Sequence, residues 1–161
     1  MGIWREVLVS VVETKVDIRY PQVSTSLSSD NKLAHLTVFC ELQGLGSAGT
    51  ITGSLTASFN GGVEIKQRIS ILAGQIQSIV FNYTKFAELN VTEPALWWPW
   101  ELGPQTLHNL TLAFTSDASP TQPNVLTTRI GLRSITSAID KNGYRLFTVN
   151  NRPYFLRGGG W

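Results

Sequence analysis

Apolar and polar residues alternate along most of this chain, with the period of two that is typical of β-strands with one buried face. The clearest run covers residues 51–59, where apolar or small residues alternate with Thr and Ser. The turn sequence Asn60-Gly61-Gly62 follows, and the alternation resumes over residues 63–71. Two such runs across an Asn-Gly turn predict an antiparallel hairpin.

The alternation recurs over residues 79–83, 109–114 and 126–132. Asp140-Lys141-Asn142-Gly143 predicts a turn into another strand at Tyr144. The run from Gly2 to Glu13 predicts one long strand, which belongs either to a preceding domain or to the edge of this one.

Two segments interrupt the pattern. Thr84 to Leu89 predicts a single helical turn with Thr84 as its cap. Ser116 to Pro123, which contains Pro120 and Pro123, predicts a loop between strands. With roughly seven to nine short strands, the chain is expected to form an all-β, immunoglobulin-like antiparallel β-sandwich.

Composition and charge exclude several classes of partner. The 161 residues are enough for one domain with a hydrophobic core. The net charge is +2 and the Lys and Arg residues are scattered, which argues against nucleic acid binding. No stretch approaches the ~18 apolar residues of a membrane span, so no membrane partner is expected.

The single cysteine, Cys40, excludes an internal disulfide. It alternates in phase with the apolar residues Leu36, Val38 and Leu42. This position predicts a buried, inert thiol, and the alternative is a reactive nucleophile.

Three Asn-x-Thr sequons begin at Asn82, Asn90 and Asn109. Asn82 and Asn109 fall on the polar side of their strands. The sequons favour glycosylation and a secreted, extracellular protein from a eukaryote, in which case a signal peptide is expected upstream of this sequence.

No catalytic residue, metal site or cofactor is predicted within the chain. His35 and His108 lie far apart in the sequence and do not have the spacing of metal ligands. A phosphate loop and a Gly-x-Ser-x-Gly motif are both absent. Glu88 and Glu93 can be proposed as a carboxylate pair, but nothing in the sequence supports that pairing.

Trp97, Trp98 and Trp100 form a cluster around Pro99. One interpretation is that these side chains pack in the core or against a neighbouring domain. The other is that they stack on sugar rings, as exposed tryptophans do in carbohydrate-binding modules. In an extended segment Trp97 and Trp98 point to opposite faces, so at most one of them can enter the core.

The chain ends with two short apolar strands around an Asn-Asn-Arg-Pro turn, followed by Gly158-Gly159-Gly160-Trp161. With three other segments, this ending resembles glycoside hydrolase family 2. Gly2–Val7 resembles the last strand of that family's jelly-roll domain. Pro94–Leu112 resembles the Leu-Trp-Trp-Pro segment of its immunoglobulin-like second domain, and Gly131–Ile135 resembles the Gly-Leu-Arg-x-Ile strand of the same domain. Phe147–Trp161 resembles the passage into its catalytic (β/α)8 barrel. The double tryptophan and the glycine-rich ending are most similar to the β-mannosidase and exo-β-D-glucosaminidase branch.

The resemblance implies three regions. Residues 1–13 would be the last jelly-roll strand or the first sandwich strand, residues 14–157 the immunoglobulin-like domain, and residues 158–161 the start of the barrel. The partners would then be the jelly-roll and barrel domains of the same polypeptide, and a polysaccharide reached through the intact enzyme. Residues that would contact those domains are Ile3, Trp4, Arg133 and Arg157. The alternative for the two arginines is a solvated edge.

The resemblance also places the chemistry outside this chain. Family 2 enzymes are retaining glycosidases, which need two carboxyl groups about 5–5.5 Å apart. In the family both are barrel glutamates, and the acid commonly follows an Asn, but this sequence has no Asn-Glu pair. The chain alone is expected to be non-catalytic, while the parent enzyme is expected to be an exo-β-D-glucosaminidase that releases glucosamine from chitosan ends. Trp161 would either approach its active site or have a purely structural role.

Overall fold

The computed structural model describes residues 7, 9, 11, 12, 14–60 and 62–157. Over these residues the chain is almost entirely β-strand, with one short 3-10 helix, and every strand pair is antiparallel. The predicted strand over residues 2–13 lies mostly outside the described residues. Its four described residues belong to no strand.

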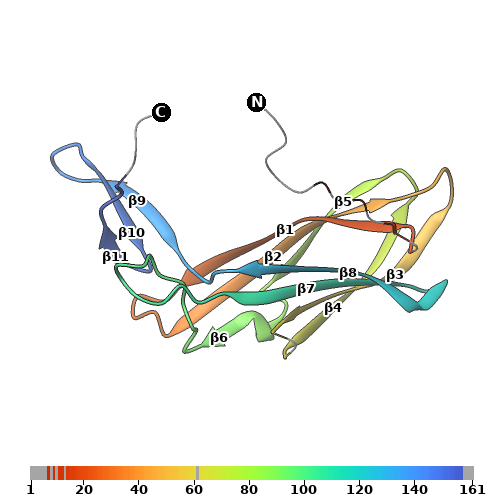
Figure 1. The fold of residues 1–161 in the computed structure, drawn as a ribbon, viewed down its shortest axis with the longest axis horizontal. Coiled ribbons are helices and arrows are strands. Elements are labelled where there is room, and N and C mark those ends of the chain that lie inside the picture. Colours follow the sequence, from red (N-terminus) through yellow and green to blue (C-terminus); the bar gives the residue numbers. More distant parts are fainter. Residues whose placement is uncertain (1–6, 8, 10, 13, 61, 158–161) are drawn as a thin grey trace.

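Two sheets form a sandwich, and a smaller sheet extends from one end of it (Figure 1). The first sheet contains β1 (Val16–Leu27), β2 (Leu33–Gly44), β5 (Ile76–Asn82) and β6 (Asn90–Thr92). In the second sheet the strands follow the order β4 (Glu64–Leu72), β3 (Thr50–Phe59), β7 (His108–Ser116) and β8 (Ser119–Ile130). The third, called here the C-terminal sheet, contains β9 (Ile135–Ile139), β10 (Arg145–Val149) and β11 (Arg152–Tyr154).

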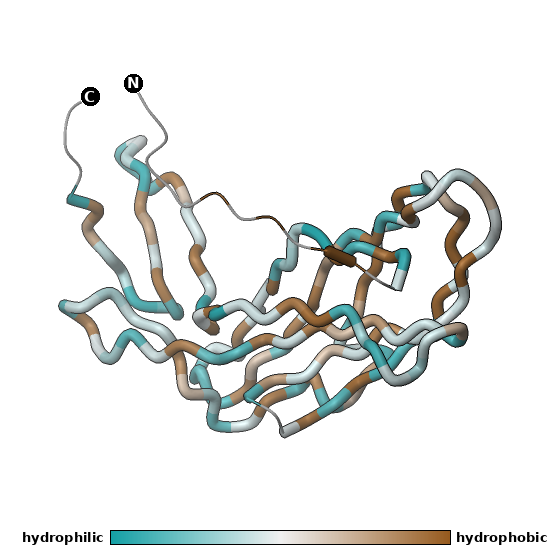
Figure 2. The backbone as a smooth tube through the Cα atoms, turned by 45° about the vertical axis from the view of Figure 1, so that its right-hand side comes forward, coloured by the Kyte–Doolittle hydropathy of each residue, from teal (hydrophilic) through white to brown (hydrophobic). Residues whose placement is uncertain are grey.

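The core lies between the two larger sheets because their strands alternate in burial. Along β2 every second residue from Ala34 to Gly44 is buried, and β7 behaves in the same way from Leu110 to Ser116. Hydrophobic and hydrophilic segments accordingly alternate along the backbone (Figure 2). Phe81 and Phe114 are the largest fully buried side chains. Burial of each large apolar side chain contributes about 1.5–3 kcal/mol.

The predicted hairpin is confirmed. β3 pairs with β4 in unbroken register from Thr50↔Leu72 to Ser58↔Glu64. Asn60 begins the turn with φ of 50°, a conformation that Asn tolerates better than most residues. The predicted turn at residues 140–143 is also present, between β9 and β10.

The loop predicted for residues 116–123 is wrong, because β8 begins at Ser119 and only Asp117 and Ala118 form the turn. Pro120 and Pro123 are tolerated since β8 is the edge strand of its sheet and the register shifts at this point.

The predicted helical cap is also wrong. The 3-10 helix covers Ala87–Leu89, and it is preceded by Phe86. Thr84 instead donates from its N–H and its Oγ1 to Oδ1 of Asn82, at 2.8 and 2.9 Å. Asn82 therefore organises this turn through its side chain.

Cys40 is buried, as predicted, with 3% of its surface exposed. Burial raises the pKa of its thiol to about 12, because the thiolate cannot be solvated there.

We expect the native chain to resist labelling by Ellman's reagent at pH 8 and to release one equivalent of thiolate dye in urea. The thiolate is the reactive form and is suppressed in the fold. Complete labelling of the native chain within the dead time of mixing would contradict this assignment.

Candidate functional site

Residues 93–107, called here the tryptophan loop, connect β6 to β7 beside the C-terminal sheet. Main-chain bonds fix the loop. The N–H of Trp97 donates to O of Leu132 at 2.9 Å, and that of Trp98 donates to O of Pro104 at 2.9 Å. Trp97 also forms a β-bridge with Gln105. The loop is thus held by hydrogen bonds between its own residues and by one to the segment that follows β8.

Trp97 and Trp98 are half-buried, and each ring lies against an arginine. The guanidinium of Arg133 lies 4.6 Å from the ring centroid of Trp97, and that of Arg152 lies 5.6 Å from that of Trp98. These distances are typical of cation–π contacts. Trp98 also packs against the core cluster.

Two glycines fit against these indoles. A Cβ atom added at Gly131 would lie 2.8 Å from Cβ of Trp97, and one at Gly103 would lie 3.1 Å from the Trp98 ring. The tight fit supports packing over sugar stacking for these two tryptophans. Trp100 differs, because 76% of its surface is exposed.

Asn150 connects the tryptophan loop to the C-terminal sheet. The residue is fully buried, and its Nδ2 donates to O of Trp97 at 2.9 Å. Its Oδ1 accepts from the N–H of Ser134 at 2.9 Å, and its own N–H donates to O of Ser134 at 2.8 Å. One side chain therefore satisfies main-chain groups of the loop and of the β8–β9 connection.

The β1–β2 turn is joined to the same point. Nδ2 of Asn31 donates to O of Asn150 at 2.9 Å. Nδ2 of Asn151 donates to O of Ser28 and to Oδ1 of Asn31, both at 2.9 Å. Asn150 and Asn151 have φ of 48° and 64°, a conformation that Asn tolerates better than most residues. We call this network of asparagines the Asn150 junction.

Arg133 lies in this region, but its guanidinium contacts the Trp97 ring of the same chain. Arg157 likewise pairs with Glu101 of the tryptophan loop, with 3.0 Å between Nη1 and Oε1. Ile3, Trp4 and Trp161 lie outside the described residues. Sequence reasoning missed the role of Asn150, although the predicted Asn-Asn-Arg-Pro turn includes this residue.

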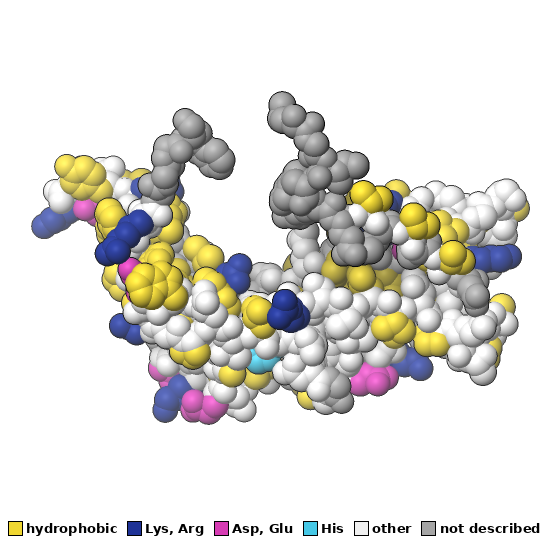
Figure 3. Space-filling model, viewed as in Figure 1, with side chains coloured by type: hydrophobic (Ala, Val, Ile, Leu, Met, Phe, Trp, Pro, Cys, Tyr) yellow, Lys and Arg dark blue, Asp and Glu magenta, His cyan; other side chains and the backbone are white. Residues whose placement is uncertain are grey.

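The C-terminal sheet is exposed on both faces. Ile135 and Ile139 expose 59% and 57% of their surface, and Leu146, on the opposite face, exposes 52%. Beyond β11, Phe155 and Leu156 expose 79% and 54%. Apolar side chains therefore gather at this end of the molecule (Figure 3). Exposed apolar patches of this kind mark interaction sites.

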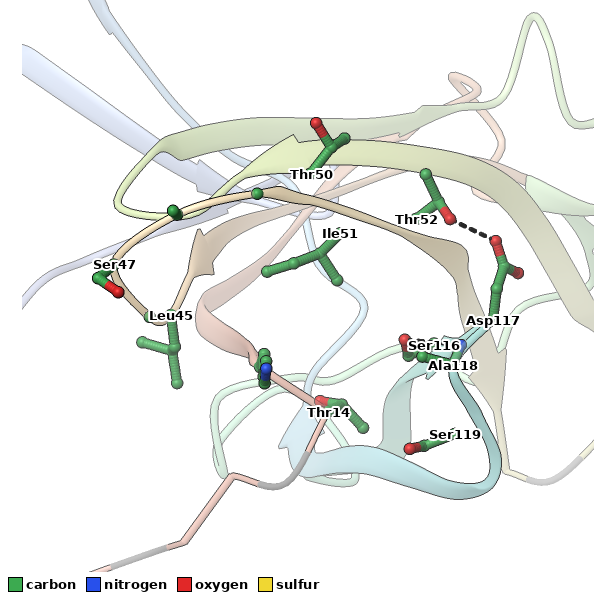
Figure 4. A pocket seen from close by; sticks show the side chains of 14 residues that line it. Thr14, Leu45, Ser47, Thr50, Ile51, Thr52, Ser116, Asp117, Ala118 and Ser119 are labelled. Carbon is green, nitrogen blue, oxygen red and sulfur yellow. Dashed lines mark hydrogen bonds between the residues drawn. The ribbon is translucent and has the colours of Figure 1, made fainter.

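A hollow of about 650 Å³ opens at the other end of the sandwich, between the β2–β3 loop and the β7–β8 turn (Figure 4). Its lining is rich in hydroxyl groups and includes one carboxylate, Asp117, among the described residues. That carboxylate accepts from Arg68 Nη1 at 2.7 Å and from Thr52 Oγ1 at 2.5 Å. These partners hold the pKa of Asp117 below its ordinary value of 3.8.

The hollow has neither the second carboxylate of a glycosidase nor an aromatic platform among its described residues. Elsewhere in the described chain, no three His, Cys, Asp or Glu side chains gather as metal ligands do. Glu88 and Glu93 are exposed, in the 3-10 helix and at the start of the tryptophan loop. No described helix is long and apolar enough to cross a membrane.

The antiparallel sandwich and its tryptophan loop define a fold, and the sequence comparison gives the class of protein. Residues 16–133 match the profile of Glycosyl hydrolases family 2, and the chain belongs to that family.

Two curated relatives illustrate the match. An exo-beta-D-glucosaminidase from Streptomyces avermitilis is 29% identical, over 100% of this chain and 17% of its own length. A beta-mannosidase B from Emericella nidulans is 26% identical, over 99% of this chain and 18% of its own length. The chain thus spans less than a fifth of either relative.

The fold is also found in a solved structure. The exo-chitosanase CsxA from Amycolatopsis orientalis superposes with a TM-score of 0.75 and 24% identity, over 91% of this chain and 16% of that protein. This similarity confirms the predicted all-β sandwich.

We expect Asn150→Gly to lower the free energy of unfolding by about 1–3 kcal/mol, since it leaves the carbonyl of Trp97 and the N–H of Ser134 without partners. Urea unfolding measures this loss, and hydrogen exchange of β9 and β10 should accelerate. Asn151→Gly is the matched comparison, because it places a glycine in the same turn at positive φ and removes only the exposed bonds of the junction, whose groups water can then solvate. It should cost less than about 1 kcal/mol. Equal losses in the two variants would contradict the dominant role of the buried Asn150 amide.

We expect Arg68→Gln to raise the pKa of Asp117 toward its ordinary value, as measured by the carboxyl ¹³C shift during titration. Because the folded pKa is lowered, the stabilisation from this ion pair is present above pH about 4 and is lost as the pH falls through the folded pKa. Arg129→Gln, at an exposed arginine of β8, is the control and should leave the Asp117 titration unchanged. An unchanged titration in Arg68→Gln would contradict the pairing.

Proposed function

We propose that this chain is the immunoglobulin-like domain of a retaining family 2 glycosidase, and that it acts as a non-catalytic scaffold between the other domains of the same polypeptide. The observation that carries the proposal is the C-terminal sheet. Its attachment to the sandwich is fixed by the buried Asn150 side chain, while both of its faces expose large apolar residues. A small sheet with two exposed apolar faces needs further packing partners.

The proposed parent enzyme is an exo-β-D-glucosaminidase that releases glucosamine from the ends of chitosan. Support comes from the S. avermitilis relative, an exo-beta-D-glucosaminidase, and from the exo-chitosanase with the same fold. The alternative parent is a β-mannosidase, which the E. nidulans relative supports at similar identity. The residues that select the sugar would lie in the barrel.

The proposed domain boundaries follow the same reasoning. Residues 14–157 would be the scaffold, residues 158–161 would begin the barrel, and residues 1–13 would belong to the jelly-roll or to the sandwich edge. Ile3, Trp4 and Trp161 would contact the neighbouring domains. Arg133 and Arg157 would serve those contacts indirectly, because they hold Trp97 and Glu101 in place within the chain.

The scaffold role has a simple physical basis. An exo-acting pocket encloses one terminal sugar, so the walls contributed by different domains must meet in a fixed arrangement. Catalysis depends on such positioning, and small displacements are costly. A spacer whose sheets are joined by buried hydrogen bonds would hold that arrangement more firmly than a flexible linker.

A second candidate function is a carbohydrate-binding module that uses the tryptophan cluster. The exposure of Trp100 favours it, since 76% of that residue is accessible for stacking. Trp97 and Trp98 would contribute little, because arginines and glycines already occupy their faces.

The scaffold proposal predicts a difference between the chain alone and the complete polypeptide. Leu146→Asp places a charge on the C-terminal sheet, and Val125→Asp places one on the outer face of β8. Both residues are 52% exposed in this structure. In the complete polypeptide, Leu146→Asp should lower the free energy of unfolding by about 1.5–3 kcal/mol, because the leucine would be buried there. Val125→Asp should change it by less than about 0.5 kcal/mol.

In the isolated chain both substitutions should have similarly small effects, as measured by urea unfolding. Equal effects in the complete polypeptide would contradict the scaffold. The isolated chain should not hydrolyse p-nitrophenyl β-D-glucosaminide, whereas the complete polypeptide should. A titration of the chain with glucosamine oligomers that shifts the Trp100 indole resonance would favour the binding module instead.

A further inference from the structure

The three sequons lie in different surroundings in the fold. These surroundings indicate which of the three asparagines can accept an N-linked glycan. Asn82 ends β5, Asn90 begins β6, and Asn109 lies near the start of β7. An Asn side chain can carry a glycan in the folded protein only when its Nδ2 is accessible and is not needed for native contacts.

Asn90 uses its whole side chain in the fold. Its Nδ2 donates to O of Tyr83 at 3.2 Å and to O of Ala87 at 3.0 Å. Its Oδ1 lies 2.5 Å from Nδ1 of His35, whose ring stacks on Tyr83 with 4.8 Å between the centroids. A glycan would replace one of the two N–H bonds and would insert a sugar between packed elements.

Asn109 is in the opposite situation. Its backbone is held by Asn60, whose Oδ1 accepts from the Asn109 N–H at 2.8 Å and whose N–H donates to the Asn109 O at 2.9 Å. Its side chain is exposed, and no hydrogen bond from it is found among the described residues. The backbone is therefore fixed while the amide is free to be modified.

The surroundings of Asn109 are polar. It pairs across the strands with the exposed Arg129, and the neighbouring pair Thr111 and Thr127 joins hydroxyls at 3.1 Å. Around Asn109, the outer face of the β4-β3-β7-β8 sheet thus offers a polar surface over which a glycan can lie. The third sequon residue, Thr111, is half-buried on the same face.

We propose that Asn109 is an N-glycan attachment site of this protein, made in a secretory pathway, and that Asn90 is not. In the transfer, Nδ2 of Asn109 forms a bond to C1 of the first sugar of a lipid-linked oligosaccharyl pyrophosphate. The bond from C1 to the pyrophosphate oxygen breaks, the amide loses one proton, and the lipid pyrophosphate leaves. The proposal is independent of the glycosidase function proposed above.

The test uses the chain fused to a secretory signal and expressed in yeast, on a Thr84→Ala background that leaves two sequons. This change removes the sequon at Asn82 but keeps the Asn82 side chain and its bond from the main-chain N–H of residue 84. Thr92→Ala then removes the sequon at Asn90 without altering the Asn90 side chain. Asn109→Gln and, separately, Thr111→Ala remove the sequon at Asn109. Each protein is taken from cells and medium, treated with and without a peptide N-glycosidase, and analysed by peptide mass spectrometry.

One glycan is expected on the Thr84→Ala protein, and one on its Thr92→Ala derivative. No glycan is expected on either derivative that lacks the Asn109 sequon. A glycan that persists after Asn109→Gln, or an Asn109 that is unmodified in the Thr84→Ala protein, would overturn the proposal.

Discussion

The arrangement of this domain depends on the amide of Asn150. Its side chain is fully buried and contacts main-chain groups from two segments, while its carbonyl accepts from Asn31 of a third. The sandwich can form without it, because the core between the larger sheets is apolar. The C-terminal sheet has few apolar contacts with that core, so its position depends on hydrogen bonds. A buried polar network is costly to break, since each group that loses its partner is also removed from water.

If the chain is a non-catalytic domain, as proposed, this dependence explains how it can still matter to an enzyme. The Asn150 junction joins the C-terminal sheet to the tryptophan loop and to the β1–β2 turn, and so constrains the angle at which this sheet leaves the sandwich. Arg133 and Arg157 reinforce the same region through Trp97 and Glu101. If the chain is a scaffold of a family 2 glycosidase, as proposed, this angle fixes how the next domain is presented.

The surfaces of the domain differ in polarity. The C-terminal sheet exposes apolar residues on both faces, including Ile135 and Leu146, whereas the outer face of the second sheet carries the Thr111–Thr127 pair and Arg129. Apolar surface favours contact with other domains, and polar surface favours water or a glycan. The hollow near Asp117 belongs to neither group, because its carboxylate is already paired with Arg68.

The sequence by itself determined the all-β class, the hairpin at Asn60 and the burial of Cys40, because these properties depend on local periodicity and turn chemistry among neighbouring residues. The family was indicated by the resemblance of four ordered segments to its motifs. Sequence reasoning misjudged residues 116–123, because whether a proline is tolerated depends on which strand lies at the edge of a sheet. Only the tertiary structure decided the roles of Trp97, Asn90 and Asn150. Their partners are distant in the chain or are positioned by the path of the backbone. An asparagine is compatible with an exposed surface and with a buried hydrogen-bond network, so its role is decided only by the neighbours that the fold places around it.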